Sequence, residues 1–148
     1  MKRQQQLSAK FRLDLSQHRD HVRAQAQVCF EAIALKVVEA IIQGNAYGNP
    51  TGTPVKTGFA KGSWAVDAAP TGGLGFLDPS GAQAVAMAAA KIVGWTLGTM
   101  LYLMNSAGYA IRLEYGWSKQ APAGMVRIVA ANWPALVRDT VEEVLATT

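Results

Sequence analysis

The sequence predicts an α+β domain in which a long N-terminal helix and a C-terminal helix pack on a small, mainly antiparallel sheet. Three observations lead to this prediction. Apolar residues recur at helical spacing from Val22 to Ile41, two short stretches at 56–67 and 99–104 are typical of strands, and helical periodicity returns after Met125. A chain of 148 residues, half of them hydrophobic, can bury one core and fits a single domain.

Residues 1–15 are expected to form a loosely ordered basic arm ahead of the domain at 16–148, because they are polar and show little periodicity. The boundary is soft, since Leu7, Phe11 and Leu15 could extend the following helix backwards at a spacing of four. The arm has a basic start but no apolar stretch of the length that a secretory signal needs, so export by that route is not expected.

The long helix is expected to end at Gly44–Asn45, because glycine and asparagine commonly follow the last helical turn. Its apolar stripe is wide and needs cover on more than one side, either from the sheet and final helix of the same chain or from a neighbouring subunit. The predicted face of this helix consists of Val22, Ala26, Cys29, Phe30, Ile33, Val37 and Ile41.

A long loop rich in glycine and proline follows this helix and leads through a turn at Lys56 into the first strand. Phe59 lies near the start of the strand, and Trp64 and Val66 share one of its faces. Residues 69–78 contain three glycines and no periodicity, so irregular structure is expected there.

Asp78 and Pro79 form the expected cap and first turn of a helix over 81–93. The strand at 99–104 follows it. The next segment, 109–115, fits either a short helix or a strand, because its apolar residues match both periods. The last helix is expected to kink or restart at Pro134.

Composition limits the function classes. The chain carries a net charge of +4 with a pI near 9.4, which favours nearby polyanions. Only 16 % of its residues are charged, against about 25 % in a typical domain, which suggests apolar surface that waits for a partner. A single cysteine excludes an internal disulfide. The apolar run 82–104 holds Lys91 at its centre, so no membrane span is expected.

Candidate catalytic and ligand-binding sets are weak. His18, His21 and Cys29 lie too far apart along a helix to share an ion, and no further ligands complete a set. The glycine-rich loop ending in Lys56–Thr57 lacks the glycine that a P-loop needs before its lysine, and its two prolines remove backbone donors. We therefore expect no metal, no cofactor, no small-molecule substrate and no enzymatic activity.

The segment from Asn105 to Arg127 contains turn residues, aromatic residues and charges. Glu114 is its only acidic residue and is expected to form a structural ion pair with Arg112, Lys119 or Arg127, within the chain or across a subunit boundary. Trp117 is equally compatible with a core position and with a contact surface.

Two motifs carry a resemblance to a known family. The first is TPVKTG at 53–58, followed by Trp64, and the second is NSAGYAIRLEYG at 105–116, followed by WSKQAPAGMVR. Together they resemble the small tail-component family, also called tail-completion or neck proteins, of long-tailed bacteriophages. The resemblance covers the chain from about Ser16 onward and is least informative over 71–80. It implies a short helix at 109–115 and places the glutamate of the family's second motif at Glu114.

The resemblance further implies a structural virion protein that helps complete the tail and joins it to the DNA-filled head. The implied partners are the tail terminator and head–tail connector proteins, within a homo-oligomeric ring in the virion, after assembly in the host cytoplasm. The implied assembly residues are Tyr109, Arg112, Glu114, Gly116, Trp117, Lys119, Gln120, Pro122 and Arg127.

Nucleic-acid binding through the basic arm is the alternative function. In either case the positive charges are candidates for contact with passing phage DNA or with an acidic partner. The residues concerned are Lys2, Arg3, Lys10, Arg12, Lys56 and Lys61.

Overall fold

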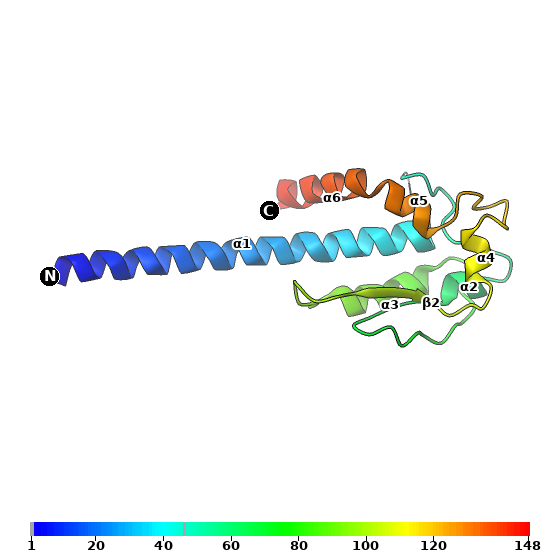
Figure 1. Ribbon diagram of the computed structural model, residues 1–148, viewed down its shortest axis with the longest axis horizontal. Helices are drawn as coiled ribbons and strands as arrows, with labels where there is room; N and C mark the ends of the chain where they lie inside the picture. Colours follow the sequence, from blue (N-terminus) through cyan, green and yellow to red (C-terminus); the bar gives the residue numbers. More distant parts are fainter. Residues whose placement is uncertain (1, 46) are drawn as a thin grey trace.

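The computed structural model describes residues 2–45 and 47–148 and has the predicted α+β architecture (Figure 1). A long N-terminal helix, a C-terminal helix and a small antiparallel sheet are all present. The elements in chain order are α1 (Lys2–Ile42), α2 (Phe59–Gly62), β1 (Trp64–Asp67), α3 (Ala82–Ile92), β2 (Tyr102–Asn105), α4 (Ala110–Glu114), α5 (Val126–Ala131) and α6 (Trp133–Thr147).

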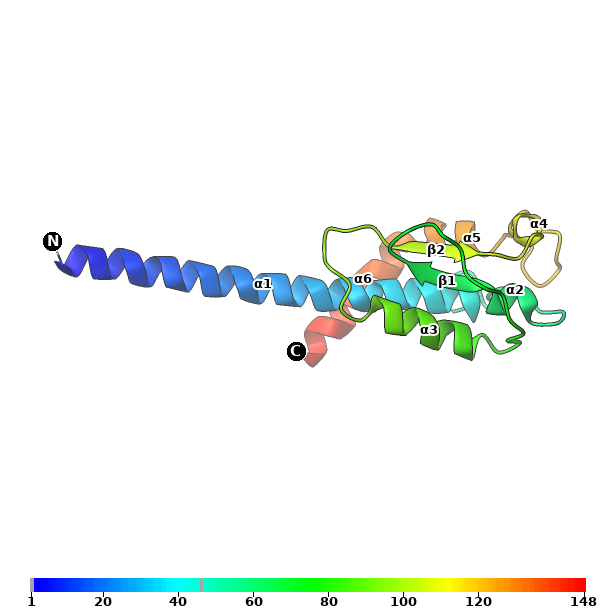
Figure 2. The same ribbon diagram turned by 90° about the horizontal axis from the view of Figure 1, so that it is seen from below.

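Helix α1 is the axis of the molecule. Figure 1 shows α6 along one side of α1, with α3 and the sheet on the other side, and α3 contacts both α1 and β1. Among the described residues the sheet has two strands, which pair antiparallel from Trp64 opposite Asn105 to Asp67 opposite Tyr102. Seen from below in Figure 2, the N-terminal half of α1 projects well beyond the remaining elements. The domain is therefore built around the C-terminal half of α1 alone.

The prediction of a loosely ordered N-terminal arm is wrong, because residues 2–15 are the first turns of α1. Their composition explains this: residues 2–42 contain no glycine or proline and are rich in Gln, Lys, Arg, Leu and Ala, which favour helix. The spacing of Leu7, Phe11 and Leu15 does extend the helix backwards. The side chains of residues 3–15 are nevertheless exposed, so helix formation there does not reflect packing against the domain.

Helix α1 ends where the sequence predicts, with Gly44 at a φ of 94°. The following loop then folds back and satisfies the last carbonyl groups of the helix. Asn49 Nδ2 donates to the Ala40 carbonyl at 2.9 Å, Thr53 Oγ1 donates to the Ile41 carbonyl at 2.8 Å, and the Thr53 backbone N–H donates to the Ile42 carbonyl at 3.1 Å. These carbonyls have no partner within the helix, so the loop supplies a C-terminal cap from a distance.

The same threonine connects this cap to the sheet. The Thr53 hydroxyl, which is fully buried, accepts a hydrogen bond of 2.8 Å from the Trp64 indole N–H. Trp64 and Val66 are buried on one face of β1, as their alternation predicts. One hydroxyl therefore joins α1, the loop and β1 inside the core.

Three element boundaries differ from the prediction. The residues before β1 form the short helix α2 instead of the start of the strand. Helix α3 begins at Ala82, after Pro79, although the Asp78 carboxylate still accepts the backbone N–H groups of Gly81 and Ala84, both at 3.0 Å. Strand β2 is displaced toward the C-terminus and includes Asn105. The irregular segment 69–78 and the break between α5 and α6 agree with the prediction.

The core lies between the C-terminal half of α1, the inner face of β1, and helices α3, α5 and α6. Its buried members are mostly aliphatic, and Trp64, Ile42 and Ile92 are among the largest side chains. Within residues 2–45 and 47–148, the structure contains no helix with the length and apolar character needed to cross a membrane. The core residues are Val38, Ala40, Ile41, Ile42, Trp64, Val66, Ala84, Ala88, Ile92, Ala121, Met125, Val129 and Leu136.

Replacing Thr53 by valine keeps the side-chain shape but leaves the Ile41 carbonyl and the Trp64 indole N–H unpaired inside the core. We expect the free energy of unfolding to fall by about 1–3 kcal/mol in urea titrations. Thr96→Val, at an exposed position, is the control and should change it by less than about 0.5 kcal/mol. Equal stability of the two variants would show that the buried hydroxyl does not join these elements energetically.

Candidate assembly surface

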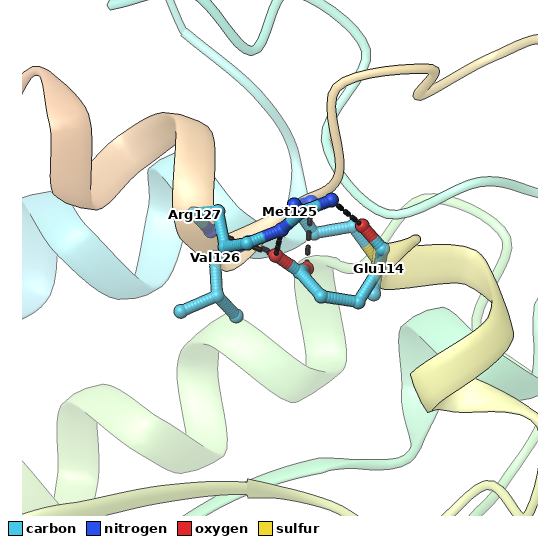
Figure 3. A network of polar contacts seen from close by, with 4 residues as sticks. All are labelled: Glu114, Met125, Val126 and Arg127. Carbon is cyan, nitrogen blue, oxygen red and sulfur yellow. Dashed lines mark hydrogen bonds and ion pairs between the residues drawn. The ribbon is translucent and has the colours of Figure 1, made fainter. Parts of the chain in front are cut away.

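Glu114, at the end of α4, closes the N-terminus of α5 (Figure 3). Its Oε2 accepts the backbone N–H groups of Met125 at 2.8 Å and Val126 at 2.9 Å, and its Oε1 accepts that of Arg127 at 2.8 Å. The first N–H groups of a helix have no partner within it and carry the positive end of the helix dipole, so a carboxylate suits this position.

Arg127 is the ion-pair partner of Glu114 among the three candidates. Its Nε lies 3.2 Å from Glu114 Oε1, and its Nη2 donates to the Glu114 backbone carbonyl at 2.6 Å. The other candidate arginine, Arg112, lies over the Trp117 ring, 5.1 Å from its centroid. The pair therefore forms within one chain and fixes how α4 meets α5.

Burial alone would raise the pKa of Glu114, but the N–H groups of Val126, Arg127 and Met125 and the Arg127 guanidinium hold it below its ordinary value of 4.5. The carboxylate is accordingly ionised and hydrogen-bonded at neutral pH. Its side chain is only 17 % exposed, whereas that of Arg127 is 55 % exposed. The charge of Glu114 is thus neutralised and hydrogen-bonded within this corner of the chain.

Two glycines permit the loop between α4 and α5. Gly124 has a φ of 89°, and a Cβ there would lie 2.5 Å from the Glu114 carbonyl oxygen. Gly116 has a φ of 81°, and a Cβ there would lie 2.5 Å from the Pro122 carbonyl oxygen. Both positions combine a left-handed backbone with a close approach, so only glycine fits without strain.

Gln120 fastens this loop to the segment that carries the first motif. Its Nε2 donates to the Val55 carbonyl and its Oε1 accepts the Val55 backbone N–H, both at 2.9 Å. The Gln120 backbone carbonyl also accepts the hydroxyl of Thr51. A side-chain amide that pairs with both backbone groups of one residue imitates a step of β-ladder, and it holds segments 65 positions apart.

Together these contacts form a surface groove of about 820 Å³, lined by residues 54–60 and by parts of the segment 109–120. Trp117 lines it and is 73 % exposed, and Tyr109 is 41 % exposed. Lys56 and Lys119 also line the groove and are exposed. The groove is therefore open, aromatic and cationic, and we refer to these four residues as the groove residues.

The predicted assembly residues thus divide into two groups. Tyr109, Trp117, Lys119 and Gln120 lie at the groove, and Arg112 packs on Trp117. The others build the loop behind the groove: Glu114, Gly116, Pro122 and Arg127.

The predicted polyanion-contact residues do not form one surface. Lys61 is only 6 % exposed, and burial lowers its pKa, an effect that the nearby Asp78 partly offsets, so its assignment as a surface cation is wrong. Lys56 lies at the groove, whereas Arg3, Lys10 and Arg12 lie on the projecting half of α1. Lys2 begins α1, and its side chain is outside the described ones.

Sequence reasoning missed the most connected polar residues. Asn49 and Thr53 cap α1, and Asn105 donates from Nδ2 to the Ala60 carbonyl at 2.8 Å and accepts the Ala107 N–H at 2.9 Å. Their position could have indicated this role, because Asn49 and Thr53 lie in the loop after α1, Thr53 and Asn105 begin the two motifs, and Asn and Thr in loops often bond to backbone groups.

The structure separates the histidines from the cysteine. Among the residues that the structure describes, no group of three or more His, Cys, Asp or Glu side chains could hold a metal ion. His18 and His21 are exposed on the projecting half of α1, while Cys29 is half-buried farther along the helix.

Replacing Glu114 by glutamine removes the charge that caps α5, and we expect the free energy of unfolding at pH 7 to fall by about 1–3 kcal/mol. A carboxyl group whose pKa is lowered by folding stabilises the protein above its unfolded pKa and stops doing so as the pH falls through the folded value. The difference between the wild type and Glu114→Gln should therefore shrink below pH 4.5.

Urea titrations at several pH values measure this difference. Glu142→Gln, an exposed change on α6, is the control and should give a small difference at every pH. A gap for Glu114→Gln that stayed constant down to the acid limit would contradict a role for the ionised form.

The chain was compared with protein-family models, with curated proteins and with solved structures, and none of them matches it. The family suggested by the two motifs consequently stays a prediction, supported by the residues that carry them.

Proposed function

We propose that this protein is a non-enzymatic structural component of a tailed-phage virion, which helps complete the tail and join it to the DNA-filled head. One observation carries the proposal. The two motifs that resemble phage tail-completion proteins, at 53–58 and 105–116, meet at one groove although about 50 residues separate them in the chain.

The fold supports this proposal because residues in or next to both motifs hold the backbone around the same groove. Thr53 and Glu114 each close the end of a helix, and Gln120 ties the two segments together. These contacts fix the backbone around the groove. The groove residues are thereby presented on a rigid support, which reduces the entropy lost when a partner binds.

The chemistry of the groove suits a protein partner. Tryptophan and tyrosine are enriched among residues that dominate binding energy, and 73 % of Trp117 is exposed although it is a large apolar side chain. Lys56 and Lys119 beside it favour a partner patch that combines apolar and acidic residues. We assign this contact to a neck neighbour, with the tail terminator and head–tail connector as the candidates.

The proposal includes a ring of identical subunits in the virion and assembly in the host cytoplasm. Neck rings have closed cyclic symmetry, so each subunit must use two different surfaces toward its neighbours.

The double variant Trp117→Ala/Lys119→Ala tests the proposal in a phage that carries this gene. We expect the yield of infectious particles to fall by at least about tenfold, because truncating a central interface tryptophan typically costs 2 kcal/mol or more. The isolated variant should keep its circular dichroism spectrum and its unfolding midpoint, since the altered side chains lie at the surface.

Leu74→Ala/Lys91→Ala is the matched control, because it removes an exposed leucine and an exposed lysine away from the groove. Its yield should equal that of the wild type. A normal yield for the groove variant would show that the groove does not contact neck neighbours. The meeting of the two motifs at the groove would then no longer support the proposal.

A further inference from the structure

The N-terminal part of α1, residues 2–24, projects from the domain (Figure 1). Its last turn lies near the end of α6, where His21 and Ala24 line a small pocket with Val144 and Leu145. At about 1.5 Å per residue this extension is roughly 35 Å long. Residues 3–24 are exposed, with Ser16 as the one partly covered position. In proteins most of the stability of a helix comes from packing of its amphipathic face, and the exposed side chains of the extension leave that face free for a partner.

The net charge of the whole chain resides in this extension. Residues 1–24 hold six of the 14 Lys and Arg residues and two of the 10 Asp and Glu residues, which gives +4. The remaining 124 residues hold eight of each and are neutral. Such a separation of charge within one small protein specifies where an acidic partner would bind.

The extension has an apolar stripe. Leu7, Phe11, Leu15 and Val22 are 62 %, 64 %, 54 % and 48 % exposed. Their spacings of four, four and seven place them within about 80° of one another on a helix that turns by about 100° per residue. His18 lies in the same stripe. This spacing is the pattern by which an amphipathic helix places anchors in the groove of another protein.

A row of arginines lies beside the stripe. Arg12, Arg19 and Arg23 have spacings of seven and four, so they share one face of the helix next to the apolar residues. Arg19 forms an ion pair of 2.9 Å with Asp20, but both side chains are about 60 % exposed, so this pair is weak and leaves the arginine available.

We propose that the extension is a docking helix for a protein partner that presents an apolar groove rimmed by acidic residues. The apolar stripe fills the groove, and the arginine row contacts the acidic rim. The inference rests on α1 alone and holds independently of the function proposed for the groove residues.

Three other occupants fit the extension less well. Nucleic acid would use the arginines but has no need of four exposed apolar side chains at anchor spacing. A membrane surface needs a broader apolar face than this stripe, and Asp14 borders the stripe on its other side. A second copy would bring two extensions of +4 together, which is repulsive.

The test measures binding of the full chain to Ca²⁺-loaded calmodulin, whose apolar, Met-rich groove accepts basic amphipathic helices. Duplex DNA and vesicles of phosphatidylcholine with phosphatidylserine serve as parallel probes. We expect binding to calmodulin that weakens at least about tenfold in Phe11→Ala/Leu15→Ala, since each side chain contributes more than 1.4 kcal/mol when buried. The triple variant Arg12→Gln/Arg19→Gln/Arg23→Gln should weaken it similarly.

Leu13→Ala is the matched control, because Leu13 is 56 % exposed on the face opposite the stripe, and alanine keeps the helix propensity high. Its affinity should stay within about twofold of the wild type. Binding to DNA or to vesicles in preference to calmodulin would overturn the proposal, and so would self-association through the stripe. The proposal would also fail if the full chain did not bind calmodulin, or if Leu13→Ala lost as much affinity as the stripe variant. The Trp117→Ala/Lys119→Ala variant should bind calmodulin normally. This result would show that the docking helix acts independently of the groove on which the proposed function rests.

Discussion

The fold depends on closing two helix ends with side chains from elsewhere in the chain. The last carbonyl groups of α1 are capped by the loop that carries Thr53, and the first N–H groups of α5 are capped by Glu114. Ala40, Ile41 and Ile42 are buried, and each buried backbone group without a partner costs about 1–3 kcal/mol of a net stability of only about 5–15 kcal/mol. Each capping side chain lies 9 to 13 residues from the groups that it caps, so each cap fixes one loop, and the pairing of Gln120 with Val55 then joins the two loops at one corner of the molecule.

This constraint separates the residues that build the corner from those that it displays. Gly116 and Gly124 allow the loop to pass close to its neighbours, and Gln120 binds it to the first motif. Trp117 then points outward with Arg112 packed on its ring. The resemblance to tail-completion proteins is thus carried partly by residues that hold the fold. Support for an assembly role comes instead from the exposed groove residues, which these fold-stabilising residues hold in place.

Sequence patterns correctly predicted the features that depend on neighbouring residues. Gly44 ended α1, alternation placed Trp64 and Val66 on one face, and Pro134 marked the restart of the last helix. The burial of Lys61, the choice of Arg127 as the partner of Glu114 and the cap formed by Thr53 depend on segments that meet only after folding, so no spacing in the sequence contains them. The polar composition of residues 2–15 predicts a loosely ordered arm, but their helix propensity is high and α1 includes them, as the spacing of Leu7, Phe11 and Leu15 allows.

Electron microscopy of lysates from a phage that lacks this gene tests the assembly role most directly. The account predicts filled heads and separate tails, and it predicts joined infectious particles after the purified protein is added. Normal joined particles without the protein would contradict the account, because no step between tail and head would then depend on the corner that Thr53 and Glu114 hold together.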